Sequence, residues 1–182
     1  EERGDLRAGG LGRGLLLRGA VGLTGKGYES YAASVGPLSS AWDRACELYA
    51  QLVGARTDYG VKHAQDFGHE RYGIDYETPL FDGWGTERAV NLVGHSFGGA
   101  TIRLFLDILA DGSAEEQAAA KAAGTEVSPF FEGGKAEDLD IVVELQRAVN
   151  RQVAEHVVVV RQKVRVQHTV ERLEHGLPVL TI

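Results

Sequence analysis

Residues 90–102 read Val-Asn-Leu-Val-Gly-His-Ser-Phe-Gly-Gly-Ala-Thr-Ile, and this stretch decides the fold. Its apolar start predicts a buried strand over 89–93, and the apolar residues from Ala100 to Leu109 predict a helix. Between them, Gly94-His95-Ser96-Phe97-Gly98 fits the pattern G-x-S-x-G, the sharp turn that exposes a nucleophilic serine at the edge of a parallel sheet. The stretch therefore predicts an α/β fold.

Ser96 is the predicted nucleophile of this turn. The residues two before and two after it approach each other, so both must be as small as glycine. The backbone N–H of Phe97, at the start of the helix, would donate to the oxyanion that forms during acyl transfer. The alternative is a glycine turn with a capping serine. We interpret His95 as a packing or hydrogen-bonding residue, since neighbouring side chains diverge at such a turn.

The clearest helix upstream of the turn covers residues 39–53, where apolar side chains recur on one face. Ser40 followed by Asp43 resembles a capping box with Asp in place of Glu. Cys46 lies on the apolar face, which indicates a small core residue rather than a nucleophile. A strand is expected over 28–35, before the Gly36-Pro37 pair.

The remaining segments give weaker expectations. The glycine-punctuated stretch 58–73 predicts an ordered loop with at most one helical turn. Helices are expected over 114–123 and 139–155, and strands over 157–160 and 164–170. Residues 1–27, rich in Gly and Arg, predict little structure beyond a short strand at 15–17. We divide the chain into segments 1–27, 28–134 and 135–182.

Composition narrows the classes of function. The chain has 182 residues with a net charge of −7, and no basic stripe, which argues against nucleic-acid binding. One cysteine excludes an internal disulfide framework and a thiolate zinc cluster. No apolar run approaches the length of about 18 residues that a transmembrane helix needs, and no signal peptide is visible.

Several further segments resemble the zinc-containing family of bacterial true lipases found in Bacillus and staphylococci, which are α/β-hydrolases. The resemblance runs from Tyr28 to Gly134, and the phrase Trp42-Asp43-Arg44-Ala45-Cys46 is its most specific part. The segments that carry it are 34–47 (SVGPLSSAWDRACE), 58–63 (DYGVKH), 68–73 (GHERYG), 94–99 (GHSFGG) and 128–134 (SPFFEGG). The resemblance implies an α/β-hydrolase with a mostly parallel sheet, incomplete over this length.

The resemblance also implies a structural zinc ion. The matching ligand positions are Asp43, His63 and His69, and imidazole nitrogen with carboxylate oxygen suits zinc. The fourth ligand of the family has no counterpart, so Asp58, Asp66 or water would complete the site. The alternatives are that Asp43 only caps its helix and that each histidine is an ordinary polar loop residue.

The implied activity is hydrolysis of acylglycerol esters through an acyl-enzyme at Ser96, with secretion and transient contact with a lipid surface. Residues 135–182 do not resemble the family, and no catalytic base has motif support. A shortened chain would have impaired activity. The alternative is a non-catalytic hydrolase-derived fragment that retains the zinc loop and self-associates, while an acyltransferase or thioesterase would share the serine turn. The formal candidates for the carboxylate and the base are Asp138, Asp140, His156, His168 and His175.

Overall fold

The computed structural model describes residues 29–80, 82–84, 90–135, 144–146 and 179–182. Four parallel strands form one sheet in the order β1-β6-β4-β5. Their bounds are Ser30–Ala32 for β1, Asn91–His95 for β4, Glu144–Gln146 for β5 and Val179–Thr181 for β6. Because helices pack beside a parallel sheet, the fold is α/β, as the sequence predicts.

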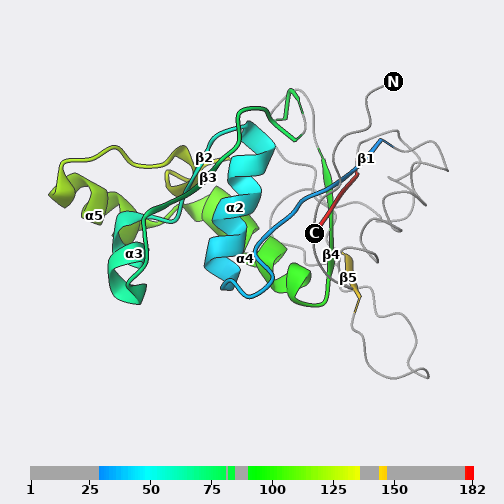
Figure 1. The fold of residues 1–182 in the computed structure, drawn as a ribbon, viewed down its shortest axis with the longest axis horizontal. Coiled ribbons are helices and arrows are strands. Elements are labelled where there is room, and N and C mark those ends of the chain that lie inside the picture. The colour runs from blue at the N-terminus through cyan, green and yellow to red at the C-terminus, as the bar shows by residue number, and fades with distance from the viewer. Residues whose placement is uncertain (1–28, 81, 85–89, 136–143, 147–178) are drawn as a thin grey trace.

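Two long helices lie beside the sheet (Figure 1). They are α2, Ala41–Val53, and α4, Phe97–Asp111, which follows β4 directly. The far side of α2 carries a smaller group of elements, in which β2 pairs antiparallel with β3. The members of this group are β2 (Arg56–Asp58), α3 (Val61–Phe67), β3 (Tyr72–Asp75) and α5 (Ala114–Ala123), with the 3₁₀ turn η1 (Pro129–Phe131) beside α4.

Most predicted elements within the described residues are confirmed. Helix α2 has Ser40 as its N-cap, and Ser40 and Asp43 form both halves of the capping box. Cys46 is buried in the core, as its place on the apolar face indicates. The helices expected around 100–109 and over 114–123 are α4 and α5, and the strands expected over 28–35 and 89–93 overlap β1 and β4.

Two predictions are wrong. Residues 58–73 do not form a loop, because α3 occupies 61–67 and strands flank it on both sides. Gly60 and Gly68 begin and end that helix instead of breaking it. Residues 144–146, expected in a helix, form β5. The expectations for 1–27, 157–160 and 164–170 lie outside the described residues.

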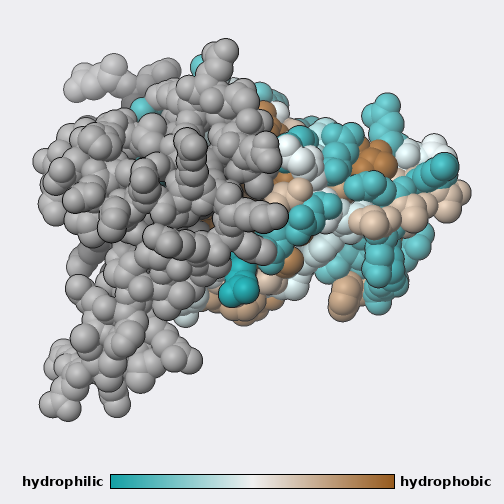
Figure 2. Space-filling model, turned by 180° about the vertical axis from the view of Figure 1, so that it is seen from behind, coloured by the Kyte–Doolittle hydropathy of each residue, from teal (hydrophilic) through white to brown (hydrophobic). Residues whose placement is uncertain are grey.

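The core lies between the sheet and the two long helices. Leu48 and Leu52 of α2 face Ile102 and Phe105 of α4, and all four are fully buried. Phe130 and Phe131 of η1 close the same cluster. Figure 2 shows the opposite face, where the described part carries hydrophilic side chains with separate hydrophobic patches between them. None of the helices within the described ranges is long and apolar enough to cross a bilayer.

Candidate active site and metal centre

Ser96 occupies the turn between β4 and α4. Its φ of 55° and ψ of −117° are unusual, because among the described residues it is the one non-glycine with positive φ. A backbone conformation of this kind costs roughly 1–3 kcal/mol and is typical of functional sites. The Ser96 side chain is exposed and does not cap α4, which argues against the capping-serine alternative.

The two glycines of the turn are required by close backbone contacts. A Cβ on Gly94 would lie 2.6 Å from the carbonyl carbon of Gly98 and 2.7 Å from the nitrogen of Gly99. A Cβ on Gly98 would lie 2.5 Å from the carbonyl oxygen of Ile182. These distances are shorter than any real Cβ contact. The predicted close approach of positions 94 and 98 is confirmed at Gly94, whereas the contact that requires glycine at position 98 is with Ile182.

Phe97 is the first residue of α4. The backbone N–H groups of a helix's first turn have no partner inside the helix, and the positive end of the helix dipole lies there. The Phe97 N–H is one of these donors. The Phe97 ring is half exposed, and the Arg44 guanidinium lies over it at 5.0 Å from the ring centroid.

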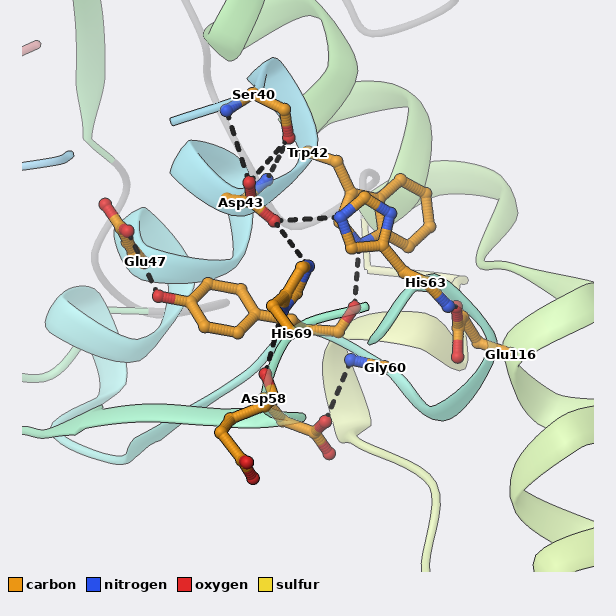
Figure 3. Close-up of polar contacts among 11 residues, drawn as sticks. Ser40, Trp42, Asp43, Glu47, Asp58, Gly60, His63, His69 and Glu116 are labelled. Carbon is orange, nitrogen blue, oxygen red and sulfur yellow. Dashed lines mark hydrogen bonds and ion pairs between the residues drawn. The ribbon is translucent and has the colours of Figure 1, made fainter. Parts of the chain in front are cut away.

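Asp43, His63 and His69 meet on the far side of α2 (Figure 3). The carboxylate oxygen Oδ1 of Asp43 lies 2.9 Å from His63 Nε2 and 3.8 Å from His69 Nε2. One ligand atom from each residue lies within 4.8 Å of the other two. The three come from different elements, since Asp43 lies in α2, His63 in α3 and His69 just after α3.

The second polar atoms of Asp43 and His69 are held by protein groups. Asp43 Oδ2 accepts hydrogen bonds from the backbone N–H and the hydroxyl of Ser40, at 3.2 and 2.8 Å, so Asp43 caps its helix and still presents Oδ1 to the histidines. His69 Nδ1 lies 2.9 Å from the carbonyl oxygen of Glu70. If Nδ1 donates to that oxygen, the lone pair of Nε2 is left for a metal, the usual arrangement of a metal-binding histidine.

A carboxylate from α5 fixes the backbone of His63. Glu116 is 4% exposed, and its two oxygens accept the N–H groups of Lys62 and His63 at 2.9 and 2.7 Å. These two N–H groups lie at the start of α3, where they have no hydrogen-bond partner inside the helix. A Cβ on Gly60 would lie 2.3 Å from the Glu116 carboxyl carbon, so glycine is needed there. Sequence reasoning missed Glu116, because 53 residues separate it from His63.

The fit of a zinc ion can be tested on this donor set. A tetrahedral ion with bonds of about 2.0–2.2 Å holds its ligand atoms about 3.4 Å apart. The separations from Asp43 Oδ1, 2.9 and 3.8 Å, bracket this value. Carboxylate oxygen and imidazole nitrogen are ordinary zinc ligands, so the residues present fit three of four positions.

Neither aspartate considered for the fourth position is available. Both Asp58 oxygens pair with the Arg71 guanidinium, at 2.9 and 2.7 Å, and Oδ1 also accepts the N–H of Gly60. Asp66 pairs with Lys62 on the exposed side of α3. The expectation that Asp58 or Asp66 completes the site is therefore not supported within the described residues.

Comparison with known proteins shows that this chain is similar to lipases. The sequence profile described as the lipase-like, C-terminal domain matches residues 16–174. The chain belongs to this lipase-like family. Lipase 2 of Staphylococcus aureus is 49% identical to it over 109 residues, and a lipase of Staphylococcus epidermidis is 47% identical over 108 residues. These alignments cover 60% and 59% of this chain.

Solved structures are also similar to this lipase-like chain. EstA from Clostridium botulinum is 46% identical with a TM-score of 0.60, covering 68% of this chain and 27% of EstA. The Staphylococcus hyicus lipase is 38% identical with a TM-score of 0.63, covering 71% of this chain and 33% of that lipase. The chain spans 16% of the curated staphylococcal relatives and a third or less of these two solved proteins.

Other reactive groups of this lipase-like chain have structural roles. Burial raises the pKa of the Cys46 thiol well above its usual range, and neighbouring acidic groups add to this. A thiol of this kind is a poor nucleophile. Burial also lowers the pKa of the Arg44 guanidinium, and the Glu47 charge acts in the opposite direction. The described imidazoles, His63 and His69, both lie at the Asp43 cluster.

Proposed function

We propose that this chain carries the nucleophile segment of a serine lipase or carboxylesterase with the α/β-hydrolase fold, acting on acylglycerol esters. The observation that carries the proposal is Ser96, a strained and exposed serine between a parallel strand and a helix. Similarity to the Staphylococcus hyicus lipase of known structure supports the same chemistry.

The reaction begins when Ser96 Oγ attacks the ester carbonyl carbon and loses its proton to a base. The carbonyl oxygen takes up negative charge, and the Phe97 N–H donates a hydrogen bond to it. The intermediate collapses with loss of the alcohol, which takes the proton back, and leaves an acyl-serine. Water then attacks the acyl-serine, releasing the fatty acid and restoring the hydroxyl.

The base must accept the proton from Ser96 within hydrogen-bond reach. The formal candidates, His156, His168 and His175, lie outside the described residues, as do the carboxylates Asp138 and Asp140. The proposal therefore assigns Ser96 and Phe97 and leaves the base unassigned.

Zinc has a structural part in the proposal. Asp43, His63 and His69 would hold it, and when bound it would join α2 to the segment from α3 to β3. The ligands come from α2, from α3 and from the residue stretch after α3, whereas Ser96 lies between β4 and α4, so we assign zinc no chemical step at Ser96. Family resemblance extends the proposal to secretion and to transient contact with a lipid surface.

Ester hydrolysis tests the proposal. We expect the chain to cleave 4-nitrophenyl butyrate and emulsified triacylglycerol, and the Ser96→Ala variant to lose both activities. The Arg103→Gln variant, at an exposed position of α4, is the matched control and should keep them. A folded chain that cleaves neither ester, or a Ser96→Ala variant that stays active, would reject the proposal.

A further inference from the structure

Arg44 and Asp43 are neighbours in α2 with different partners. Successive residues of a helix point about 100° apart. Helix α2 therefore presents Asp43 to His63 and Arg44 to Phe97 at the start of α4. The first turn of α2 thus contacts both the metal cluster and the serine turn.

The Arg44 guanidinium is partly buried and lies over the aromatic face of Phe97. Its carbon Cζ is 5.0 Å from the ring centroid, inside the range of about 6 Å for a cation–π contact. Arg44 Nε is buried, and no described residue accepts a hydrogen bond from it. The described partners of this cation are the ring of Phe97 and, through its charge, Glu47.

We propose that Arg44 is a positioning residue for the oxyanion donor, which it holds through the ring of Phe97. This inference rests on the proposed function, because it is the Phe97 N–H that the reaction uses. Phe97 is half exposed and directly follows the strained Ser96. The contact ties the first residue of α4 to α2, and in this way it would hold the backbone N–H of Phe97 in place.

A misplaced oxyanion donor weakens binding of the transition state more than binding of the substrate. Loss of the Arg44 contact should therefore lower kcat and leave KM almost unchanged. We expect a fall of about ten-fold, less than the loss of about 10²–10³ that follows complete removal of such a donor. A residue that only packed α2 on α4 would lower stability without this selective effect on kcat.

The test compares variants of the intact chain. Arg44→Met keeps the aliphatic stem and removes the cation, Arg44→Lys restores a cation, and Arg103→Met is the exposed control. We expect kcat for 4-nitrophenyl butyrate to fall about ten-fold in Arg44→Met, to recover in part in Arg44→Lys, and to stay unchanged in the control. Equal kcat in all four proteins would overturn the inference.

A second measurement needs no activity. Phe97 is replaced by 4-fluorophenylalanine, and its ¹⁹F resonance is recorded with each residue at position 44. We expect a changed shift and a broader line with Met, and a return toward the original signal with Lys. A spectrum indifferent to position 44 overturns the inference. Absence of hydrolysis by every protein, the unsubstituted chain included, overturns the proposed function, while the ¹⁹F spectrum still decides whether Arg44 holds the Phe97 ring.

Discussion

Gly94 lies so close to the start of α4 that a Cβ on it would be 2.6 Å from the carbonyl carbon of Gly98. The position of a Cβ is fixed by the backbone of residue 94, and the Gly98 carbon belongs to the backbone, so neither atom can rotate away. The contact explains why a strand can pass directly into a helix around an exposed serine. It also gives a test of the turn that is independent of catalysis.

We expect Gly94→Ala to lower the free energy of unfolding by about 2 kcal/mol, the usual range for overpacking. Gly68→Ala is the comparison, because Gly68 has a φ of +69° but open space around it. In that variant, alanine is strained by the left-handed conformation but meets no other atom, so the free energy of unfolding should fall by about 1 kcal/mol. Urea denaturation measures both, and a Gly94→Ala variant as stable as the original chain would contradict the described turn.

Glu116 is predicted to stabilise α3 from a distance. Its replacement by Ala leaves two N–H groups of the helix start without their buried acceptor, so we expect a loss of about 2–3 kcal/mol in unfolding free energy. Glu115→Ala is the matched control, since that side chain is exposed and its carboxylate only approaches Lys62 at 3.9 Å. Equal losses in the two variants would contradict the assigned role.

Zinc should stabilise the folded chain. A ligand that binds only the native state at 100 times its Kd adds about 2.7 kcal/mol, so Zn²⁺ should raise Tm by several degrees and chelation should reverse it. His69→Ala should abolish the response, whereas Asp66→Asn, at the exposed end of α3, should keep it. Thermal unfolding with and without chelator measures this, and a Tm indifferent to zinc would contradict the proposed metal centre.

The phenol of Tyr59 predicts a loss of stability at alkaline pH. Burial raises the pKa of Tyr59 first of all, and the charge of Glu47 and the hydrogen bond to it add to the effect. Because the folded pKa lies above the unfolded value of about 10, the stabilisation is complete below pH 10 and is lost as the pH rises beyond it.

Tyr59→Phe should therefore flatten the alkaline side of the stability profile. Each proton released on unfolding contributes about 1.4 kcal/mol per pH unit, and this variant removes the contribution of one proton above about pH 10. Part of the alkaline loss should remain, since burial also raises the pKa of Tyr49 and Tyr76. Urea unfolding between pH 8 and 11 measures the slope, and an unchanged slope would contradict the assignment.

The sequence predicts those helices and turns that are determined by residues close together in the chain. The Ser40–Asp43 capping box, the apolar face of α2 and the glycines around Ser96 each act within a few residues, and the structure confirms the elements they define. The alternation between strand and helix around Ser96 also predicts the parallel sheet. These features depend on backbone sterics and periodicity, which a sequence displays directly.

The elements that sequence reasoning missed depend on distant contacts. Helix α3 has seven residues, too few to display a helical period, and its start is held by Glu116 from another helix. The convergence of His63 and His69 depends on this helix. It ends at Phe67, and the left-handed Gly68 turns the chain back toward Asp43. Strand β5 was expected to be helical, since its three residues are too few to distinguish the two periods.

The central claim is that Ser96 is an activated nucleophile. The most direct test is to incubate the folded chain with a fluorophosphonate probe and to locate the adduct by peptide mass spectrometry. The account predicts a single adduct on Ser96, absent from Ser96→Ala and retained in Arg103→Gln. A folded chain that remains unlabelled, or an adduct on another residue that survives Ser96→Ala, would contradict it.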